Sequence, residues 1–177
     1  KEKIFVKNLF KKVMQGFTKA AKENPGPRSE EMHVSEEGIK LIKFFEGCKL
    51  NAYKCAAGVW TCGWGTTKGV LPGDVWSQEK ADFRLWRELD EEYEQYIKDF
   101  VEVPLNQNQF DALVSWTYNL GPTNLKNSTL LKKLNNGEYD EVPTQIKRWT
   151  KANGKELEGL IKRREAEALL FEGKSWQ

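Results

Sequence analysis

The spacing of apolar and polar positions differs between the N-terminal stretch and the rest of the chain. Over residues 1–24, apolar side chains recur at roughly helical spacing with lysines between them, which predicts a basic amphipathic helix. Proline and glycine at positions 25–27 cannot continue this helix, and they mark a break. We therefore expect an N-terminal extension at 1–33 and a compact domain at 34–177.

The pattern after the break predicts a helix, a small sheet and then several helices. Ser35, followed by two glutamates, has the features of a helix start, and this helix is expected to end at Glu46-Gly47. Residues 48–70 are rich in glycine, tryptophan and threonine, which predicts short strands and turns. This order of elements indicates an α+β fold with a dominant helical lobe.

Most of the expected helices lie in the second half of the chain. A long helix capped by Ser77 is expected to bury one stripe, which consists of Phe83, Trp86, Tyr93, Ile97 and Phe100. A second buried helix ends at Gly121-Pro122 and carries Phe110, Leu113, Val114 and Tyr118. Further helices are expected at 127–135, 138–151 and 159–171.

Composition and charge narrow the classes of function. The 177 residues contain no run of 18 apolar positions, so no membrane-spanning helix is expected. A net charge of +2 argues against a dedicated nucleic-acid binder. Residues 1–33 hold seven lysines and one arginine against four glutamates, a surplus of four positive charges. The helix at 1–24 therefore suits an anionic membrane surface, and the alternative is a helix packed on its own domain.

Few residues offer reactive chemistry. His33 is the single histidine and lies at the break, which excludes Ser-His-Asp and Cys-His machinery within the domain. No glycine-rich phosphate loop precedes a helix and no cysteine cluster has zinc spacing, so neither a cofactor nor a metal is expected. What remains is Glu46, at the end of an apolar helix. The apolar neighbours Phe44 and Phe45 would favour a proton-donating carboxyl, whereas the alternative is a solvated carboxylate at a helix end.

Three residues and four longer motifs resemble the phage-type lysozymes, glycoside hydrolase family 24. Glu46, Cys55 nine residues later and Thr61 fifteen residues later are similar to the family's Glu-Asp/Cys-Thr triad. The longer motifs are the sheet segment at 58–65, a central helix at 109–121, and the segments at 127–131 and 159–167. The resemblance runs in order through 34–177 and leaves out 1–33.

The family resemblance implies both a fold and an activity. The fold would be lysozyme-like, with a small β-sheet lobe and a larger helical lobe joined by a long helix. The activity would be that of an endolysin, a muramidase that hydrolyses the β-1,4 bond between N-acetylmuramic acid and N-acetylglucosamine in bacterial peptidoglycan. We expect a monomer that needs no cofactor, acts on glycan strands and lies in the periplasm or is exported, held at a membrane before activation.

Cys55 is the main departure from the family pattern, because most members have aspartate there. A subgroup, the signal-anchor-release endolysins, has cysteine at this position and a Glu-Gly-Cys segment like 46–48. The resemblance implies that Glu46 protonates the leaving oxygen and that Thr61 positions water. The Cys55 thiolate would act either as a nucleophile, giving a retaining enzyme, or as a base, giving an inverting one.

The three cysteines leave several pairings open. A bond from Cys48 to Cys55 would cage the catalytic thiol, and Cys62 could exchange into that bond. A Cys48–Cys62 bond would leave Cys55 free, and the alternative is three thiols in a reducing compartment. Resemblance to exported endolysins favours a regulatory disulfide at Cys55, and we expect caging to need no large movement of the fold.

The resemblance also places substrate-binding residues in the cleft. Tyr118 and Asn119 are expected to contact sugar from the central helix, and Arg163 corresponds to an arginine near the catalytic glutamate. The alternative for Arg163 is a solvated arginine on a C-terminal helix face, which is what we expect of Arg164. Two rival functions remain at this stage: a glycan-binding pseudoenzyme, and a lytic protein that acts on membranes through residues 1–24.

Overall fold

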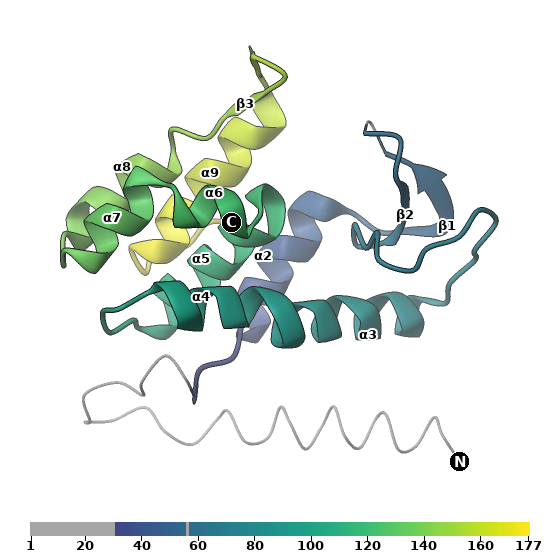
Figure 1. Cartoon of the computed structure of the whole chain (residues 1–177), viewed down its shortest axis with the longest axis horizontal. Helices are drawn as coiled ribbons and strands as arrows, with labels where there is room; N and C mark the ends of the chain where they lie inside the picture. Colours follow the sequence, from purple (N-terminus) through teal and green to yellow (C-terminus); the bar gives the residue numbers. More distant parts are fainter. Residues whose placement is uncertain (1–30, 56) are drawn as a thin grey trace.

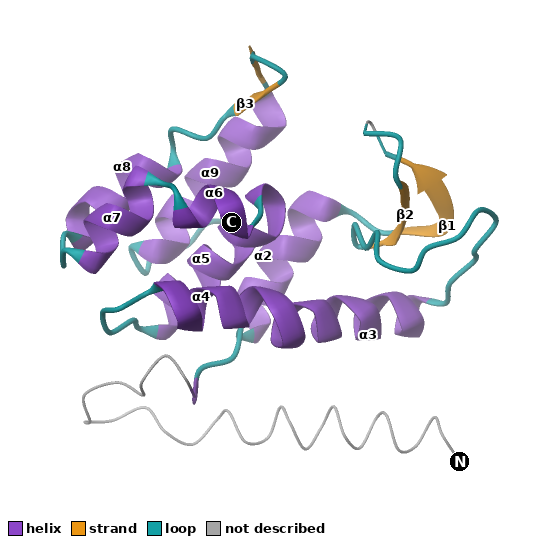
Figure 2. Cartoon of the chain, in the orientation of Figure 1, coloured by secondary structure: helices purple, strands orange, loops and turns teal. Residues whose placement is uncertain are grey.

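The computed structural model describes residues 31–55 and 57–177, so the helix expected at 1–24 lies outside the described residues. Its helices gather into one large lobe, and a two-stranded hairpin stands apart at the other end of the molecule (Figures 1 and 2). A long helical segment runs along one side and joins the two lobes (Figure 1). The α+β fold expected from the sequence is confirmed.

Helix α2 (Glu36–Glu46) begins and ends where the sequence predicts. The Ser35 hydroxyl accepts hydrogen bonds from the backbone N–H groups of Glu37 and Gly38, which caps the first turn. Leu41 and Ile42 are fully buried on the inner face of the helix. Met32 also belongs to the core, so the packed structure includes residues just ahead of the boundary expected at 34.

The small lobe is built on strands β1 (Lys49–Lys54) and β2 (Trp60–Gly63), which pair antiparallel. The register changes between Lys49 and Tyr53, so the hairpin contains an irregularity. Neighbouring residues of a strand face opposite sides, and Cys62 therefore points into a small apolar cluster while Thr61 points away from it. Four buried residues form that cluster: Cys62, Val70, Trp76 and Ala81.

Three consecutive elements form the long connecting segment: α3 (Gln78–Glu88), the π-helix η2 (Leu89–Tyr93) and α4 (Glu94–Phe100). Ser77 caps it as expected. The stripe expected to be buried is wrong in part. Phe83 is 43% exposed, and the fully buried positions are Ala81, Leu85, Leu89 and Ile97. A turn of π-helix advances the chain by more residues than an α-helical turn, so the apolar face changes phase at this point.

Helix α5 (Gln107–Leu120) is the centre of the large lobe and packs against α2 and α9. It starts with a capping box, in which Asn106 and Gln109 satisfy each other's backbone N–H groups. Eight consecutive residues from Phe110 to Thr117 are buried. The helix ends at Gly121, as the sequence predicts, so Tyr118 and Asn119 lie at the carboxyl end of a fixed scaffold.

The last third of the chain differs from the sequence prediction in one place. Helices α6 (Pro122–Lys126), α7 (Thr129–Asn135) and α9 (Glu158–Phe171) account for most of it. The single helix expected at 138–151 is wrong: η3 (Tyr139–Glu141) and α8 (Val142–Ile146) are followed by a hairpin of β3 (Lys151–Ala152) and β4 (Lys155–Glu156). Asn153 and Gly154, both with positive φ, form its turn, as Asn-Gly pairs favour in short hairpins.

Candidate active site

A cavity of about 260 Å³ opens where the small lobe meets the helical lobe. Helix α2 contributes Glu46, and the end of α5 contributes Tyr118 and Asn119. The loop after β2 and the long connecting segment supply the other lining residues, which are Gly65, Thr67, Lys68, Glu88, Glu92 and Tyr93. Most of these groups are polar, as expected of a site that binds a hydroxyl-rich ligand.

Glu46 is held by an arginine from the far end of the chain. Nη1 of Arg163 lies 2.5 Å from Oε1 of Glu46, and the two side chains are 4% and 19% exposed. Arg163 also binds Oε1 of Glu167 through Nε, at 3.1 Å, and the carbonyl oxygen of Ser115 through Nη2, at 3.3 Å. Burial alone would lower the pKa of Arg163, but the carboxylates of Glu167 and Glu46 outweigh burial and raise it.

The surroundings of Glu46 are less apolar than the sequence predicts. Phe44 is 71% exposed and does not enclose the carboxyl, whereas the ring of Phe45 packs against the Arg163 guanidinium at 5.8 Å. Arg163 does not line the cavity and spends its donors on protein groups. Direct sugar binding by Arg163 therefore stays a prediction, and its contact at the site is the one to Glu46.

Gly65 lets the backbone of the small lobe approach the Glu46 carboxyl. A Cβ at this position would lie 3.2 Å from Oε2 of Glu46 and 3.8 Å from the Tyr118 hydroxyl. Its φ of +97° is a conformation that residues with a side chain rarely adopt. The Tyr118 hydroxyl donates to the carbonyl oxygen of Trp64 at 2.9 Å, which ties α5 to the same loop. Oε2 of Glu46, the oxygen that Arg163 leaves free, therefore faces the loop at the cavity.

Arg164 is fully buried, so the expectation that it is solvated is wrong. Its Nη2 donates to Oδ1 of Asn119 at 2.6 Å, and its Nη1 lies 3.2 Å from Oε2 of Glu167. Two neighbouring arginines thus share one buried carboxylate, Glu167. Arg163 reaches past it to Glu46, and Arg164 reaches Asn119 at the cavity wall.

Cys55 directly follows β1, and Thr61 lies on β2 opposite Tyr53, so the two residues are close together. The Thr61 hydroxyl donates to the carbonyl oxygen of Val59 at 3.0 Å. Hydrogen bonds from the backbone of Val59 and Ala57, and then from the Thr61 side chain, lower the pKa of the Cys55 thiol from its ordinary value. By contrast, burial raises the pKa of both Cys48 and Cys62. Cys55 is therefore the thiol most readily ionised, although neither it nor Thr61 lines the cavity.

All three cysteines are free thiols in this structure. Cys48 directly precedes β1 and Cys55 directly follows it, so the six residues of the strand hold their Cα atoms roughly 20 Å apart. A disulfide needs its Cα atoms within about 7 Å. The expectation that caging needs no large movement is therefore wrong for this pair. Cys62 lies by the start of β1, its Sγ 3.5 Å from the Lys49 carbonyl oxygen, and shares an apolar cluster with Cys48.

Five cavity residues were not expected from the sequence: Thr67, Lys68, Glu88, Glu92 and Tyr93. Lys68 reaches from the loop to Glu92 on η2, with Nζ 2.6 Å from Oε1, and so bridges the two sides of the cavity. Burial raises the pKa of Glu88, which favours its neutral form. Glu88 and Glu92 stand one helical turn apart. That spacing was visible in the sequence but is equally typical of a solvated helix face.

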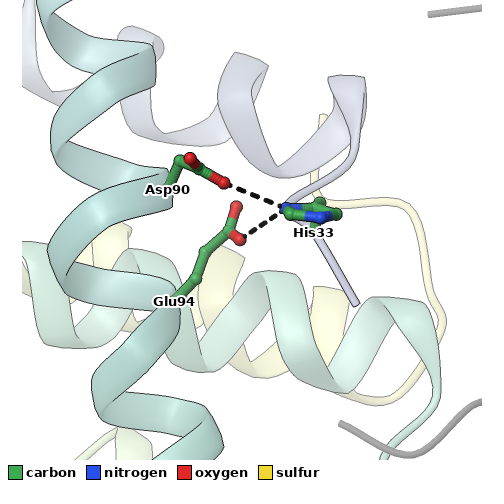
Figure 3. A group of neighbouring side chains, drawn as sticks. All are labelled: His33, Asp90 and Glu94. Atoms are coloured by element: carbon green, nitrogen blue, oxygen red, sulfur yellow. Dashed lines mark hydrogen bonds and ion pairs between the residues drawn. The ribbon is translucent and has the colours of Figure 1, made fainter. Parts of the chain in front are cut away.

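At a second place, His33, just ahead of α2, faces Asp90 and Glu94 on the long connecting segment (Figure 3). Nδ1 of His33 lies 2.9 Å from Oε2 of Glu94 and 3.2 Å from Oδ1 of Asp90. Three such groups could in principle hold a metal ion. Glu94 is already used, however: its Oε1 accepts from the Val34 backbone at 2.9 Å, and Lys98 lies 3.3 Å from its Oε2. A nearby ammonium group disfavours a second cation.

Comparisons with known proteins agree on one family. A family model described as phage lysozyme matches residues 43–167. The endolysin of Acyrthosiphon pisum secondary endosymbiont phage 1 is 48% identical over 145 residues, which are 80% of this chain and 99% of that protein. The endolysin of Bacillus phage B103 is 42% identical over 79% of this chain and 54% of its own length. The SAR-endolysin of Bacteriophage PS119 is 36% identical over 69% of this chain and 73% of its own.

Solved structures show the same fold. The muramidase domain of SpmX from Asticaccaulis excentricus is 36% identical, with a TM-score of 0.73, over 79% of this chain and 98% of that one. The active form of P1 phage endolysin Lyz gives a TM-score of 0.74 at 24% identity, over 93% and 92% of the two chains. The secreted inactive form of that protein gives a TM-score of 0.53 at 20% identity, over 78% of this chain and 95% of that one. The fold described above is thus more similar to the active form.

Proposed function

The chain belongs to the phage lysozyme family, and from this premise we propose that Glu46, Cys55 and Thr61 carry out its glycosidase chemistry. The family's members are glycoside hydrolases, and this chain is an endolysin of the muramidase type that acts on bacterial peptidoglycan. The bond hydrolysed is the β-1,4 link between N-acetylmuramic acid and N-acetylglucosamine. The observation that carries the assignment is the carboxyl of Glu46, which ends α2, lines the cavity and is bound on one oxygen by Arg163.

Glu46 acts as the general acid in this proposal. In its protonated form, Oε1 is the carbonyl oxygen and accepts from Arg163 Nη1, while Oε2 carries the proton. Oε2 is the oxygen beside Gly65, so the proton is directed toward the cleft and the leaving glycosidic oxygen. Arg163 thereby fixes which oxygen donates, since it offers only donors and can bind only the unprotonated oxygen.

Cys55 supplies the second half of the reaction. Its lowered pKa increases the share of thiolate, the form that attacks carbon or accepts a proton. As a nucleophile, the thiolate displaces the protonated leaving group at the anomeric carbon, and water then releases the sugar with retention. As a base, the thiolate takes a proton from a water positioned by Thr61, and that water attacks with inversion. The anomeric form of the first product, read by proton NMR, separates the two routes.

The test of the function is the release of reducing ends from purified cell walls, measured with and without reductant. The wild-type protein is expected to release them, and Glu46→Gln is not. A glycan-binding pseudoenzyme or a purely membrane-active protein releases none in either condition. Dye leakage from protein-free vesicles identifies the membrane-active rival. A folded wild-type protein that binds walls without releasing reducing ends would overturn the proposal.

We also propose that oxidation of Cys55 controls the enzyme. A thiolate held in a disulfide can neither attack nor accept a proton. Because β1 separates Cys48 from Cys55, the caged form requires the β1–β2 hairpin to be rearranged, and the conformation described here corresponds to the uncaged state. The fold is more similar to the active form of P1 Lyz than to its inactive form, which supports the assignment of this conformation to the uncaged state. In the uncaged state the compatible bond is Cys48–Cys62.

The place of action is the periplasm, where the peptidoglycan lies, as the SAR-endolysin relatives indicate. We propose that the enzyme is held at the membrane before activation, and residues 1–24, which lie outside the described residues, are the candidate contact. Among the described helices, none is long and apolar enough to cross a bilayer. We propose that the enzyme acts as a monomer, because Glu46, Cys55 and Thr61 all belong to one chain.

A further inference from the structure

Arg164 lies behind the cavity wall, and its burial is not explained by the chemistry proposed above. Its side chain is fully buried in α9, and its charge is balanced by Glu167, with Nη1 and Oε2 3.2 Å apart. Within the described part of the chain, Nε and Nη1 make no hydrogen bond. The single acceptor that its guanidinium reaches with good geometry is Oδ1 of Asn119, 2.6 Å from Nη2. A buried arginine with unsatisfied N–H donors lowers the stability of the fold. Its contact with Asn119 is therefore the feature that could account for its presence.

The contact to Arg164 decides which way the Asn119 amide faces. A guanidinium has five N–H donors and no acceptor, so the amide atom that contacts Arg164 must be the carbonyl oxygen, Oδ1. The amide nitrogen, Nδ2, with its two N–H donors, is then fixed on the side of the amide that faces away from Arg164. Among the described residues, no protein acceptor binds Nδ2, and Asn119 lines the cavity. A reversed amide would set N–H donors against the guanidinium and leave Oδ1 without its partner.

We propose that Arg164 is a positioning residue that fixes the Asn119 amide, so that its NH₂ group recognises the carbonyl oxygen of a 2-acetamido group on the glycan. This inference rests on the proposed contact between Asn119 and the substrate, and it deepens that contact by assigning its polarity. A group restricted to donating selects an acceptor. The acetamido carbonyl, which both amino sugars carry, is a strong acceptor, whereas a free amine at the same carbon is charged and would be repelled.

The first experiment replaces the donor and keeps the contact to Arg164. In Asn119→Asp, one carboxylate oxygen still accepts from Arg164, so the fold is retained, but the second oxygen faces the cleft in place of NH₂. We expect KM for cell-wall glycan to rise at least about tenfold, with kcat changed less than about threefold, because the interaction lost is one of binding. Asn153→Asp, in the exposed β3–β4 turn, is the matched control and is expected to leave both constants unchanged.

The second experiment tests whether Arg164 acts through Asn119. Arg164→Lys keeps a positive charge beside Glu167 but loses the planar fork, and we expect KM to rise as in Asn119→Asp. In the Asn119→Ala background, Arg164→Lys should add no further change in KM. On chemically de-N-acetylated glycan, wild-type kcat/KM should fall about tenfold, whereas Asn119→Asp should no longer prefer the acetylated substrate. A purely structural Arg164 would lower stability without moving this preference.

The outcomes distinguish the glycan contact of Asn119 from the fixed orientation of its amide. If Asn119→Ala leaves KM unchanged, the glycan contact of Asn119 is wrong and this inference falls with it, while the result for Glu46→Gln stands. If Asn119→Ala raises KM but Asn119→Asp behaves as wild type, the contact holds and its fixed polarity is refuted. Independent, multiplying effects of Arg164→Lys and Asn119→Ala on KM would also overturn it. Should Arg164→Lys not fold, the Asn119→Asp and substrate comparisons decide alone.

Discussion

Arg163 and Glu46 are 117 positions apart in the sequence, yet Nη1 of the arginine lies 2.5 Å from Oε1 of the glutamate. Helix α2 ends at Glu46 and helix α9 carries Arg163, so the pair joins the first and last helices of the described fold. Because Arg163 takes one carboxyl oxygen and Gly65 leaves space beside the other, the fold would set the direction of the proton transfer proposed for Glu46.

Glu46→Gln is expected to lower the rate of reducing-end release at least about 100-fold, because an amide of the same shape cannot donate the proton. Its oxygen can still accept from Arg163, so the melting temperature should stay near that of the wild type. Glu36→Gln, at the exposed start of the same helix, is the control and should keep full activity. Substantial release by a folded Glu46→Gln variant would contradict the assignment.

Gly65→Ala is expected to reduce activity more than it reduces stability. The new methyl group would lie 3.2 Å from Oε2 of Glu46, in a backbone conformation that costs about 1–3 kcal/mol for a residue with a side chain. Gly73→Ala has a similar positive φ but no atom within 4 Å, so it isolates the backbone cost. Both variants should lose similar stability in thermal denaturation, and only Gly65→Ala should lose most of its turnover. Equal turnover in the two variants would show that a side chain at position 65 does not affect Glu46.

Cys55→Asp should remain active and become insensitive to oxidants and reductants, because a carboxylate fills the role that aspartate has in most of the family. Cys55→Ser should lose most activity, since an uncharged hydroxyl without a neighbouring histidine is a poor nucleophile and base. Cys48→Ser, assayed in reductant, controls for loss of a thiol and should match the wild type. Equal rates for Cys55→Ser and wild type would remove Cys55 from the mechanism.

The pH dependence of thiol alkylation should identify Cys55 as the first cysteine to react. Its pKa is lowered by hydrogen bonds from the backbone of Val59 and Ala57 and from Thr61, so its thiolate forms at lower pH than an ordinary thiol. Thr61→Val removes one of these hydrogen bonds, which raises the pKa and shifts the midpoint of the rate profile to higher pH. Mass spectrometry of reduced protein after short iodoacetamide pulses measures the midpoint. An unchanged midpoint in Thr61→Val would disprove the contribution of Thr61.

Partial oxidation should lower activity in step with the loss of the Cys55 thiol, and reductant should restore it. Peptide mapping of the inactive fraction is expected to find Cys55 joined to Cys48 or, as the second candidate, to Cys62. Because the caged form requires a rearranged hairpin, its amide exchange in residues 49–63 should be faster than in the reduced form. A fully active oxidised protein with Cys48–Cys62 as its bridge would show that this bond is structural.

Local signals account for the parts of the structure that the sequence predicted. Ser35 and Ser77 cap helices through contacts with residues two or three positions away, and Gly121 ends α5 in the same short-range way. The arrangement of the triad came from resemblance to a family. The hairpin at β3–β4 was readable in principle from Asn153-Gly154, but the helical spacing of its neighbours outweighed that pair.

Long-range packing accounts for the parts that were not predicted. Arg163 and Arg164 are identical in type and adjacent in sequence, and only the position of Glu167 between α5 and α9 makes both of them buried. Phe83 looks apolar enough for a core, yet it is exposed, and the buried face of this segment runs through Ala81, Leu85 and Leu89. A carboxylate that reaches across a cavity, such as Glu92, shares its pattern with solvated helix faces.

The strand between Cys48 and Cys55 acts as a thermodynamic link between folding and redox chemistry. Since the folded strand and a Cys48–Cys55 bond exclude each other, the free energy of the β1–β2 ladder enters the reduction potential of that bond. Every 1.4 kcal/mol that a substitution adds to the ladder makes the bond easier to reduce by about 30 mV. Other residues of the ladder, such as the cross-strand pair Lys54 and Trp60, would thereby influence the redox threshold of the proposed switch.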